Sequence, residues 1–181
     1  MVRYLKTNPG QGILLKSFSD LRLTAYYDAD WASCPMTRRS LTAYFVFLGD
    51  SPISWKTKKQ PTISCSSAEA EYCALAITTC ELKWLRGLLF TLGVHHPTPV
   101  RIYSDSQSAL YIAQNPVFHE RTKHIEVDCH FIRDEICRGT IHPTYVPTTH
   151  QLADILPKVL GKHQFVQLLA KLGISNLHAP T

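Results

Sequence analysis

The sequence predicts an α/β fold built on a five-stranded mixed sheet flanked by helices. Three segments rich in β-forming residues follow one another near the N-terminus, and a long helical segment then leads to another short strand. Consecutive strands joined by a tight turn pair antiparallel, whereas a strand reached through a helix usually pairs parallel. The predicted order is β-β-β-α-β-α-α-β-α, with an antiparallel three-strand meander plus two parallel-type strands.

The meander is predicted from residues 21–27 (LRLTAYY), 40–49 (SLTAYFVFLG) and 51–60 (SPISWKTKKQ). Gly49 and Asp50 mark the turn between the second and third of these strands. The third strand is basic on one face. The meander is therefore expected to form one antiparallel half of the sheet.

A long helix is expected to begin at Ser66, because Glu69 three residues later completes a capping-box pattern, and to stop near Gly93. The later predicted elements are a strand at 99–104, helices at 105–115 and 122–139, a strand at 140–147 and a helix at 150–160. Residues 1–20 form a lead-in, residues 21–160 a single domain and residues 161–181 a C-terminal tail. No internal repeat is visible.

Composition sets broad limits on the class of protein. The chain has 181 residues, 45% of them hydrophobic, which is ordinary for a globular domain. No run of about 18 apolar residues predicts a membrane span, and the N-terminus has no apolar signal segment. Six cysteines without a CxxC pair indicate reduced thiols and a cytoplasmic or nuclear protein. A net charge of +5 is weakly in favour of a polyanionic partner.

Two aspartates follow predicted strands that should be neighbours. Asp28 ends the first strand, within YYDADW, and Asp105 ends the fourth, within IYSD. If the two strands pair in parallel, both carboxylates emerge at the same edge of the sheet, where ligands of α/β proteins gather. Asp30 is expected to be a local turn carboxylate, because strand alternation gives it no necessary place beside Asp28.

The long helix adds a third carboxylate. At about 100° per residue, Glu71 falls within the apolar arc formed by the helix leucines, which spans roughly 80°, whereas Glu69 falls on the opposite face. Glu69 is therefore expected to be a solvated capping residue. Glu71 should point toward the sheet, where a lone carboxylate is costly unless it is paired or binds metal. A core-edge carboxylate held by a local hydrogen bond remains the alternative.

Three or four converging carboxylates suit Mg²⁺ or Mn²⁺, which prefer oxygen ligands. Two such ions about 4 Å apart would activate a water and stabilise the leaving oxygen of a phosphodiester. Asp154 is a weaker candidate on pattern alone, because the apolar face of its predicted helix excludes it.

Long strings of the sequence resemble the ribonuclease H domain of Ty1/copia-type LTR retrotransposon Pol polyproteins. They are YDADWASCPMTRRSLTAYFVFLG, ISWKTKKQPTISCSSAEAEY, SDSQSALYIAQNPVFHERTKHIEVDCHFIRDEI and VPTTHQLADILPK, in chain order. In addition, RYLKTNPGQGILL resembles the tail of the reverse transcriptase that precedes this domain. The resemblance covers nearly the whole chain.

The resemblance implies a ribonuclease H-like fold and a two-metal endonuclease that cuts the RNA strand of RNA–DNA hybrids. Carried over by position, the catalytic and metal-binding carboxylates would be Asp28, Glu71, Asp105 and Asp154. The implied cofactor is Mg²⁺ or Mn²⁺, in two ions. The implied partners are the hybrid and reverse transcriptase.

Two departures concern the closing segment. The only histidine near the last carboxylate is His150, which would assist product release or proton transfer, or would be an ordinary solvated loop residue. Pro157 stands where the family usually has threonine. Because proline clashes with the carbonyl four residues back, the last helix is expected to be kinked or to start later.

Two basic clusters are candidate phosphate contacts, which would position a duplex without reading its sequence. They comprise Lys56, Lys58, Lys59, Arg121, Lys123 and His124. An ordinary solvated basic face is the alternative for each cluster. Trp55 is expected to be a core residue.

Other functions stay open. A host could have adopted the domain as a catalytically weak or inactive module that acts by binding nucleic acid or protein. A related nuclease acting on DNA, as integrases do, is disfavoured by the closing QLADIL segment. A polymerase is set aside, because the chain has no room for a palm and fingers.

Overall fold

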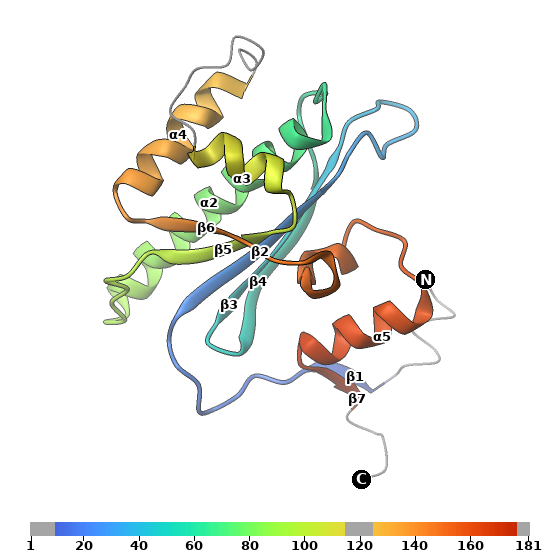
Figure 1. Cartoon of the computed structure of the whole chain (residues 1–181). Coiled ribbons are helices and arrows are strands. Elements are labelled where there is room, and N and C mark those ends of the chain that lie inside the picture. The colour runs from blue at the N-terminus through green and yellow to red at the C-terminus, as the bar shows by residue number, and fades with distance from the viewer. Residues whose placement is uncertain (1–9, 115–124, 177–181) are drawn as a thin grey trace.

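The structure, a computed structural model, describes residues 10–114 and 125–176. Its centre is a five-stranded sheet in the order β4-β3-β2-β5-β6 (Figure 1). The strands are β2 (Leu23–Asp30), β3 (Leu41–Leu48), β4 (Ser51–Lys59), β5 (Val100–Ser104) and β6 (Ile141–Tyr145).

The pairing of the strands confirms the predicted mixed sheet. β2 with β3 and β3 with β4 pair antiparallel, which makes the meander. β2 with β5 and β5 with β6 pair parallel, as their helical connections require. Among the described residues, no helix is both long and apolar enough to span a membrane.

Three helices lie on one side of the sheet (Figure 1): α2 (Ser67–Thr91), α3 (Gln107–Gln114) and α4 (Glu126–Cys137). Ser66 Oγ accepts from the Glu69 N–H at 3.3 Å, as the predicted capping box requires. The Glu69 carboxylate accepts from the N–H of Cys65, the residue before the N-cap, at 2.7 Å. The chain leaves the helix at Gly93, whose φ of +81° favours glycine. Glu69 is nevertheless buried, so the prediction of a solvated side chain was wrong.

The main hydrophobic core fills the space between these helices and the sheet. It contains the predicted helix leucines Leu75, Leu82, Leu85 and Leu89, all buried, together with apolar side chains of β2, β5 and β6. This packing fixes the rotation of α2 about its axis. The rotation decides where the carboxylates of its first two turns point.

A smaller core lies on the other face of the sheet. Phe45 and Phe47 of β3 pack there with Leu152, Leu168 and Leu172. The elements on this side are β1 (Gln11–Ile13), the 3-10 turns η2 (Thr148–His150) and η3 (Leu152–Ile155), α5 (Lys162–Lys171) and β7 (Ile174–Asn176). β1 pairs antiparallel with β7, from Gln11 opposite Asn176 to Ile13 opposite Ile174.

The helix predicted at 150–160 is replaced by two short 3-10 turns, and the next helix begins only at Lys162. Pro157 gives the physical reason. It has no N–H to donate to the carbonyl of Ala153, which accepts instead from the Leu156 N–H at 3.0 Å. The segment expected as a tail contains α5 and β7, because Leu168 and Leu172 are buried in the smaller core.

Trp55 also differs from expectation. It lies on β4, the edge strand, and 50% of its side chain is exposed, so it is not a core residue. Its ring lies 6.4 Å from that of Phe45, measured between centroids. Pattern alone could not show that the strand carrying it is an edge strand.

Candidate metal site

The candidate site lies where the two central parallel strands separate. β2 and β5 are paired only as far as Tyr26 and Tyr103. Asp28 and Asp105 each follow two residues later, so their side chains emerge beyond the last paired position. This is the sheet edge at which ligands of α/β folds bind, as the sequence predicted.

α2 brings Glu71 to the same place. One potential ligand oxygen from each of Asp28, Glu71 and Asp105 lies within 4.8 Å of the others. Glu71 is held by its Oε1, which accepts from the Ala29 N–H at 3.2 Å. Asp105 is held by Thr148, whose hydroxyl donates to Oδ2 at 2.8 Å. Three carboxylates from three elements thus converge.

Two of these carboxylates are buried and incompletely paired. Asp28 is fully buried and Glu71 is 6% exposed. Asp28 Oδ2 and Glu71 Oε2 have no hydrogen-bond partner among the described residues. Buried anionic oxygens without a partner are costly, and a hard divalent cation with oxygen ligands would satisfy both. The donor set therefore fits Mg²⁺ or Mn²⁺.

The pKa of Glu71 reflects the crowding of negative charge at this site. Burial, and then the neighbouring Asp28 carboxylate, raise the pKa of Glu71 well above its ordinary value. The Ala29 N–H opposes this shift only in part. Like charges this close favour one protonated group unless a cation lies between the two carboxylates.

Asp154 approaches the site from the opposite face of the sheet. It lies on η3 and is 1% exposed, so the solvated position favoured by periodicity is wrong. It is not one of the three converging ligands, but Lys158 links it to them. The Lys158 ammonium donates to Asp154 Oδ1 at 2.8 Å and to Asp28 Oδ1 at 2.9 Å.

Burial raises the pKa of Asp154 to about 6, although the hydrogen bond from Lys158 lowers it. The two carboxylates in turn raise the pKa of Lys158 above its ordinary value, against the effect of its own burial. The ammonium therefore stays charged throughout the physiological range. The Lys158 ammonium therefore connects Asp154 to Asp28, one of the three converging ligands.

Three residues that position the site were missed from sequence: Thr148, Gln151 and Lys158. Gln151 is fully buried, and its side chain donates to the carbonyl of Tyr27 at 3.0 Å while accepting from the Ala153 N–H. It therefore anchors η3 to β2 beside Asp28. The available signal for Lys158 was its spacing, four residues after Asp154, which places opposite charges together in a helical turn.

His150 and Asp30 remain at the margin. His150 is exposed, and its Nδ1 lies 3.0 Å from the hydroxyl of Thr149. Asp30 is the last residue of β2 and is partly exposed, with a pKa raised by burial and by Asp28. Neither joins the three converging ligands, and an auxiliary role for His150 stays a prediction.

The basic candidates divide into two groups. Lys56, Lys58 and Lys59 are exposed on the edge strand β4. Because side chains alternate along a strand, Lys56 and Lys58 share one face and Lys59 takes the other. The second cluster, Arg121, Lys123 and His124, lies outside the described residues, and phosphate contacts of both clusters stay predictions.

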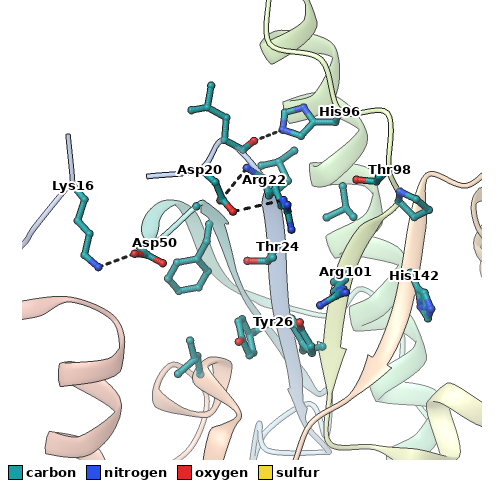
Figure 2. A pocket seen from close by; sticks show the side chains of 18 of the residues that line it. Lys16, Asp20, Arg22, Thr24, Tyr26, Asp50, His96, Thr98, Arg101 and His142 are labelled. Atoms are coloured by element: carbon teal, nitrogen blue, oxygen red, sulfur yellow. Dashed lines mark hydrogen bonds and ion pairs between the residues drawn. The ribbon is translucent and has the colours of Figure 1, made fainter. Parts of the chain in front are cut away.

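A cavity of about 1200 Å³ lies near the other end of the parallel strands. Figure 2 shows Thr24, Tyr26, Arg101 and His142 on the strands that line it, with the ion pair between Lys16 and Asp50 at its rim. None of the four candidate carboxylates lines this cavity. The cavity is therefore separate from the candidate metal site at the strand edge.

Sequence comparison places the chain among retrotransposon proteins. It is 43% identical over 177 residues to the retrovirus-related Pol polyprotein from transposon RE1 of Arabidopsis thaliana, covering 98% of this chain. It is 44% identical over 174 residues to that from transposon RE2, covering 96% of this chain. The chain spans 12% of the length of each of these relatives. No protein-family model matches it.

Solved structures show the fold. RNase H1 from Halobacterium salinarum superposes with a TM-score of 0.52 at 14% identity, over 73% of this chain and 90% of that one. LC11-RNase H1, isolated from compost, gives 0.55 at 14% identity, over 74% and 91%. The chain therefore belongs with the copia-type retrotransposon Pol polyproteins, as the segment that has the ribonuclease H fold.

Proposed function

We propose that this chain is a divalent-metal-dependent endonuclease that hydrolyses the RNA strand of RNA–DNA hybrids. The observation that carries the proposal is the convergence of Asp28, Glu71 and Asp105, with ligand oxygens within 4.8 Å of one another. In the part of the chain that the structure describes, two of these side chains have a buried oxygen without a hydrogen-bond partner, which is the arrangement a cation would complete. The relationship to Pol polyproteins supports a nuclease-type role.

Asp28, Glu71 and Asp105 would hold the metal, with Asp154 as a fourth carboxylate on the opposite side of Asp28. When bound, two divalent ions would activate the attacking water and stabilise the leaving oxygen of the phosphodiester. The protein's part is to fix the ligands before substrate arrives. The Ala29 N–H orients Glu71, the Thr148 hydroxyl orients Asp105, and Gln151 fixes η3 against β2.

An RNA–DNA hybrid is the substrate favoured by chemistry as well as by relationship. An A-form-like duplex offers a wide minor groove, and in a hybrid its 2′-hydroxyls lie on one strand only. LC11-RNase H1, one of the proteins that share this fold, has been solved in complex with an RNA/DNA hybrid. Hydrolysis would leave a 3′-hydroxyl and a 5′-phosphate.

The test is cleavage of an end-labelled RNA–DNA hybrid in Mg²⁺ or Mn²⁺, with single-stranded RNA and duplex DNA as control substrates. Asp105→Asn should reduce hybrid cleavage by at least a hundredfold, because it removes one anionic ligand and keeps the side chain's size. Gln114→Ala, an exposed change on α3, should cut like the wild type.

Cutting restricted to the hybrid and lost in Asp105→Asn would support the enzyme. Tight hybrid binding without any cutting in either metal would refute the proposal and favour the binding module instead. Cutting of duplex DNA alone would point to an integrase-like nuclease.

A further inference from the structure

Asp28 divides its two oxygens between different surroundings. Oδ1 accepts from the Lys158 ammonium at 2.9 Å, whereas Oδ2 has no partner among the described residues. Glu71 Oε2 likewise has none. One side of the Asp28 carboxylate is therefore open to a cation, and the other side already has one.

Lys158 is well placed to act as that cation. Its ammonium contacts Asp28 and Asp154 at 2.9 and 2.8 Å, and both of these carboxylate side chains are 1% exposed. An ammonium at this distance from two desolvated carboxylates offsets much of the repulsion between them. The lysine side chain is itself 31% exposed, so it has a route to solvent when it leaves.

We infer that Lys158 is an internal counter-ion of this site: it holds Asp28 and Asp154 together until a divalent ion that uses Asp154 displaces it. The inference rests on the proposed metal site but not on hybrid cleavage. It makes Lys158 a positioning residue that lowers the affinity of the Asp154 side for metal. A metal ion would first occupy the position between the three converging ligands. The position beside Asp154 would be occupied only at a higher metal concentration.

Calorimetric titration of the whole chain with MnCl₂ and MgCl₂ tests this competition. Lys158→Met keeps the length of the side chain and removes its charge. The Lys158→Met protein should bind the second, more weakly held metal ion at least tenfold more tightly than the wild type does. Lys158→Arg keeps the charge, so its affinity for the second metal ion should be unchanged or lower. Lys171→Met is the matched control, because Lys171 is exposed and its ammonium donates to a backbone carbonyl, that of Thr149 on the adjoining turn.

A lysine that only stabilised the fold would give a different result. Lys158→Met would then lower the melting temperature without changing metal affinity, and that outcome would overturn the inference. If Lys158→Met does not fold without metal, Lys158→Gln is the variant to titrate. Its amide is uncharged but can still donate a hydrogen bond to a carboxylate, which helps the fold. Tighter binding of the weaker ion is expected there as well.

Amine labelling of the wild-type protein gives a second, independent readout. Reductive methylation with formaldehyde and cyanoborohydride, followed by peptide mass spectrometry, measures how accessible each lysine is. Saturating Mn²⁺ should raise labelling of Lys158 at least threefold and leave that of Lys171 unchanged. Unchanged labelling of Lys158 at saturation, or no divalent binding at all, would contradict the inference. Loss of hybrid cleavage with this metal response intact would count against the proposed function alone.

Discussion

Glu71 shows how a side chain placed at the candidate metal site can oppose the stability of the fold. Its carboxylate is buried beside Asp28, and both effects raise its pKa. A raised pKa means that the folded chain binds the proton more tightly than the unfolded chain does. Ionisation of Glu71 therefore costs stability, and the cost appears as the pH rises above the ordinary glutamate value.

Glu71→Gln should make the metal-free protein more stable at pH 7 by about 1–2 kcal/mol, because the amide carries no charge to desolvate. The stability of the wild type should fall as the pH rises from about 4.5 through the raised pKa of Glu71, and the variant should lose this part of the pH dependence. Urea denaturation between pH 4 and 8 measures the difference. A variant that is less stable at every pH would contradict the electrostatic account.

The same substitution should abolish the stabilisation that divalent ions give. Wild-type protein should gain thermal stability in 10 mM MgCl₂, because a ligand that binds only the folded state stabilises it. Glu71→Gln should gain little under the same conditions. Melting curves with MgCl₂ and with a KCl control of equal ionic strength distinguish specific binding from general screening.

At the scale of elements, the segment after β6 determines where Asp154 lies. Helical periodicity predicted a solvated Asp154, but the segment is not an α-helix, because Pro157 cannot donate to the Ala153 carbonyl. The buried Gln151 holds the resulting 3-10 turn against the backbone of β2. Local pattern could identify the proline but not the distant carbonyl that Gln151 reaches.

Gln151→Ala should destabilise the protein by about 1–3 kcal/mol, because it leaves the buried carbonyl of Tyr27 without its donor. Gln114→Ala, at an exposed position, should change the stability by less than about 0.5 kcal/mol. Chemical denaturation measures both. Equal effects of the two substitutions would mean that Gln151 does not anchor η3.

The parts predicted well from sequence are those fixed by local chemistry. The capping box at Ser66 and Glu69 placed the start of α2, and the leucine periodicity then placed Glu71 on the sheet side. Parallel pairing through one helical crossover brought Asp28 and Asp105 to the same edge. Gln151 was missed because the carbonyl that it reaches lies more than a hundred residues away in the chain. The bond of Lys158 to Asp28 is equally distant, and only its bond to Asp154 is local.

At the scale of the whole molecule, charge should govern how tightly the chain holds a duplex. The net charge is +5, and Lys56 and Lys58 are exposed on the same face of the edge strand β4. Long-range attraction of this kind depends on salt and not on base sequence. The two lysines are therefore expected to contribute to affinity more than to the chemical step.

Lys56→Ala with Lys58→Ala should reduce the slope of log affinity against log salt by about 1.4–1.8, since each phosphate contact contributes roughly 0.7–0.9. The charge-matched control is Lys162→Ala with Lys171→Ala, two exposed lysines at the ends of α5. Fluorescence anisotropy of a labelled hybrid in Ca²⁺, over a range of KCl concentrations, measures the slope. Equal slopes in the two variants would assign the effect to net charge and not to β4.

The pairing of β1 with β7 has a mechanical consequence. Gln11, where the described chain begins its first strand, lies opposite Asn176, where it ends its last. Tension applied through the two ends therefore opens this ribbon one hydrogen-bonded pair at a time, as a zipper opens, before any load reaches the five-stranded sheet. Until the ribbon has opened, such tension does not load the strand edge that carries the carboxylates.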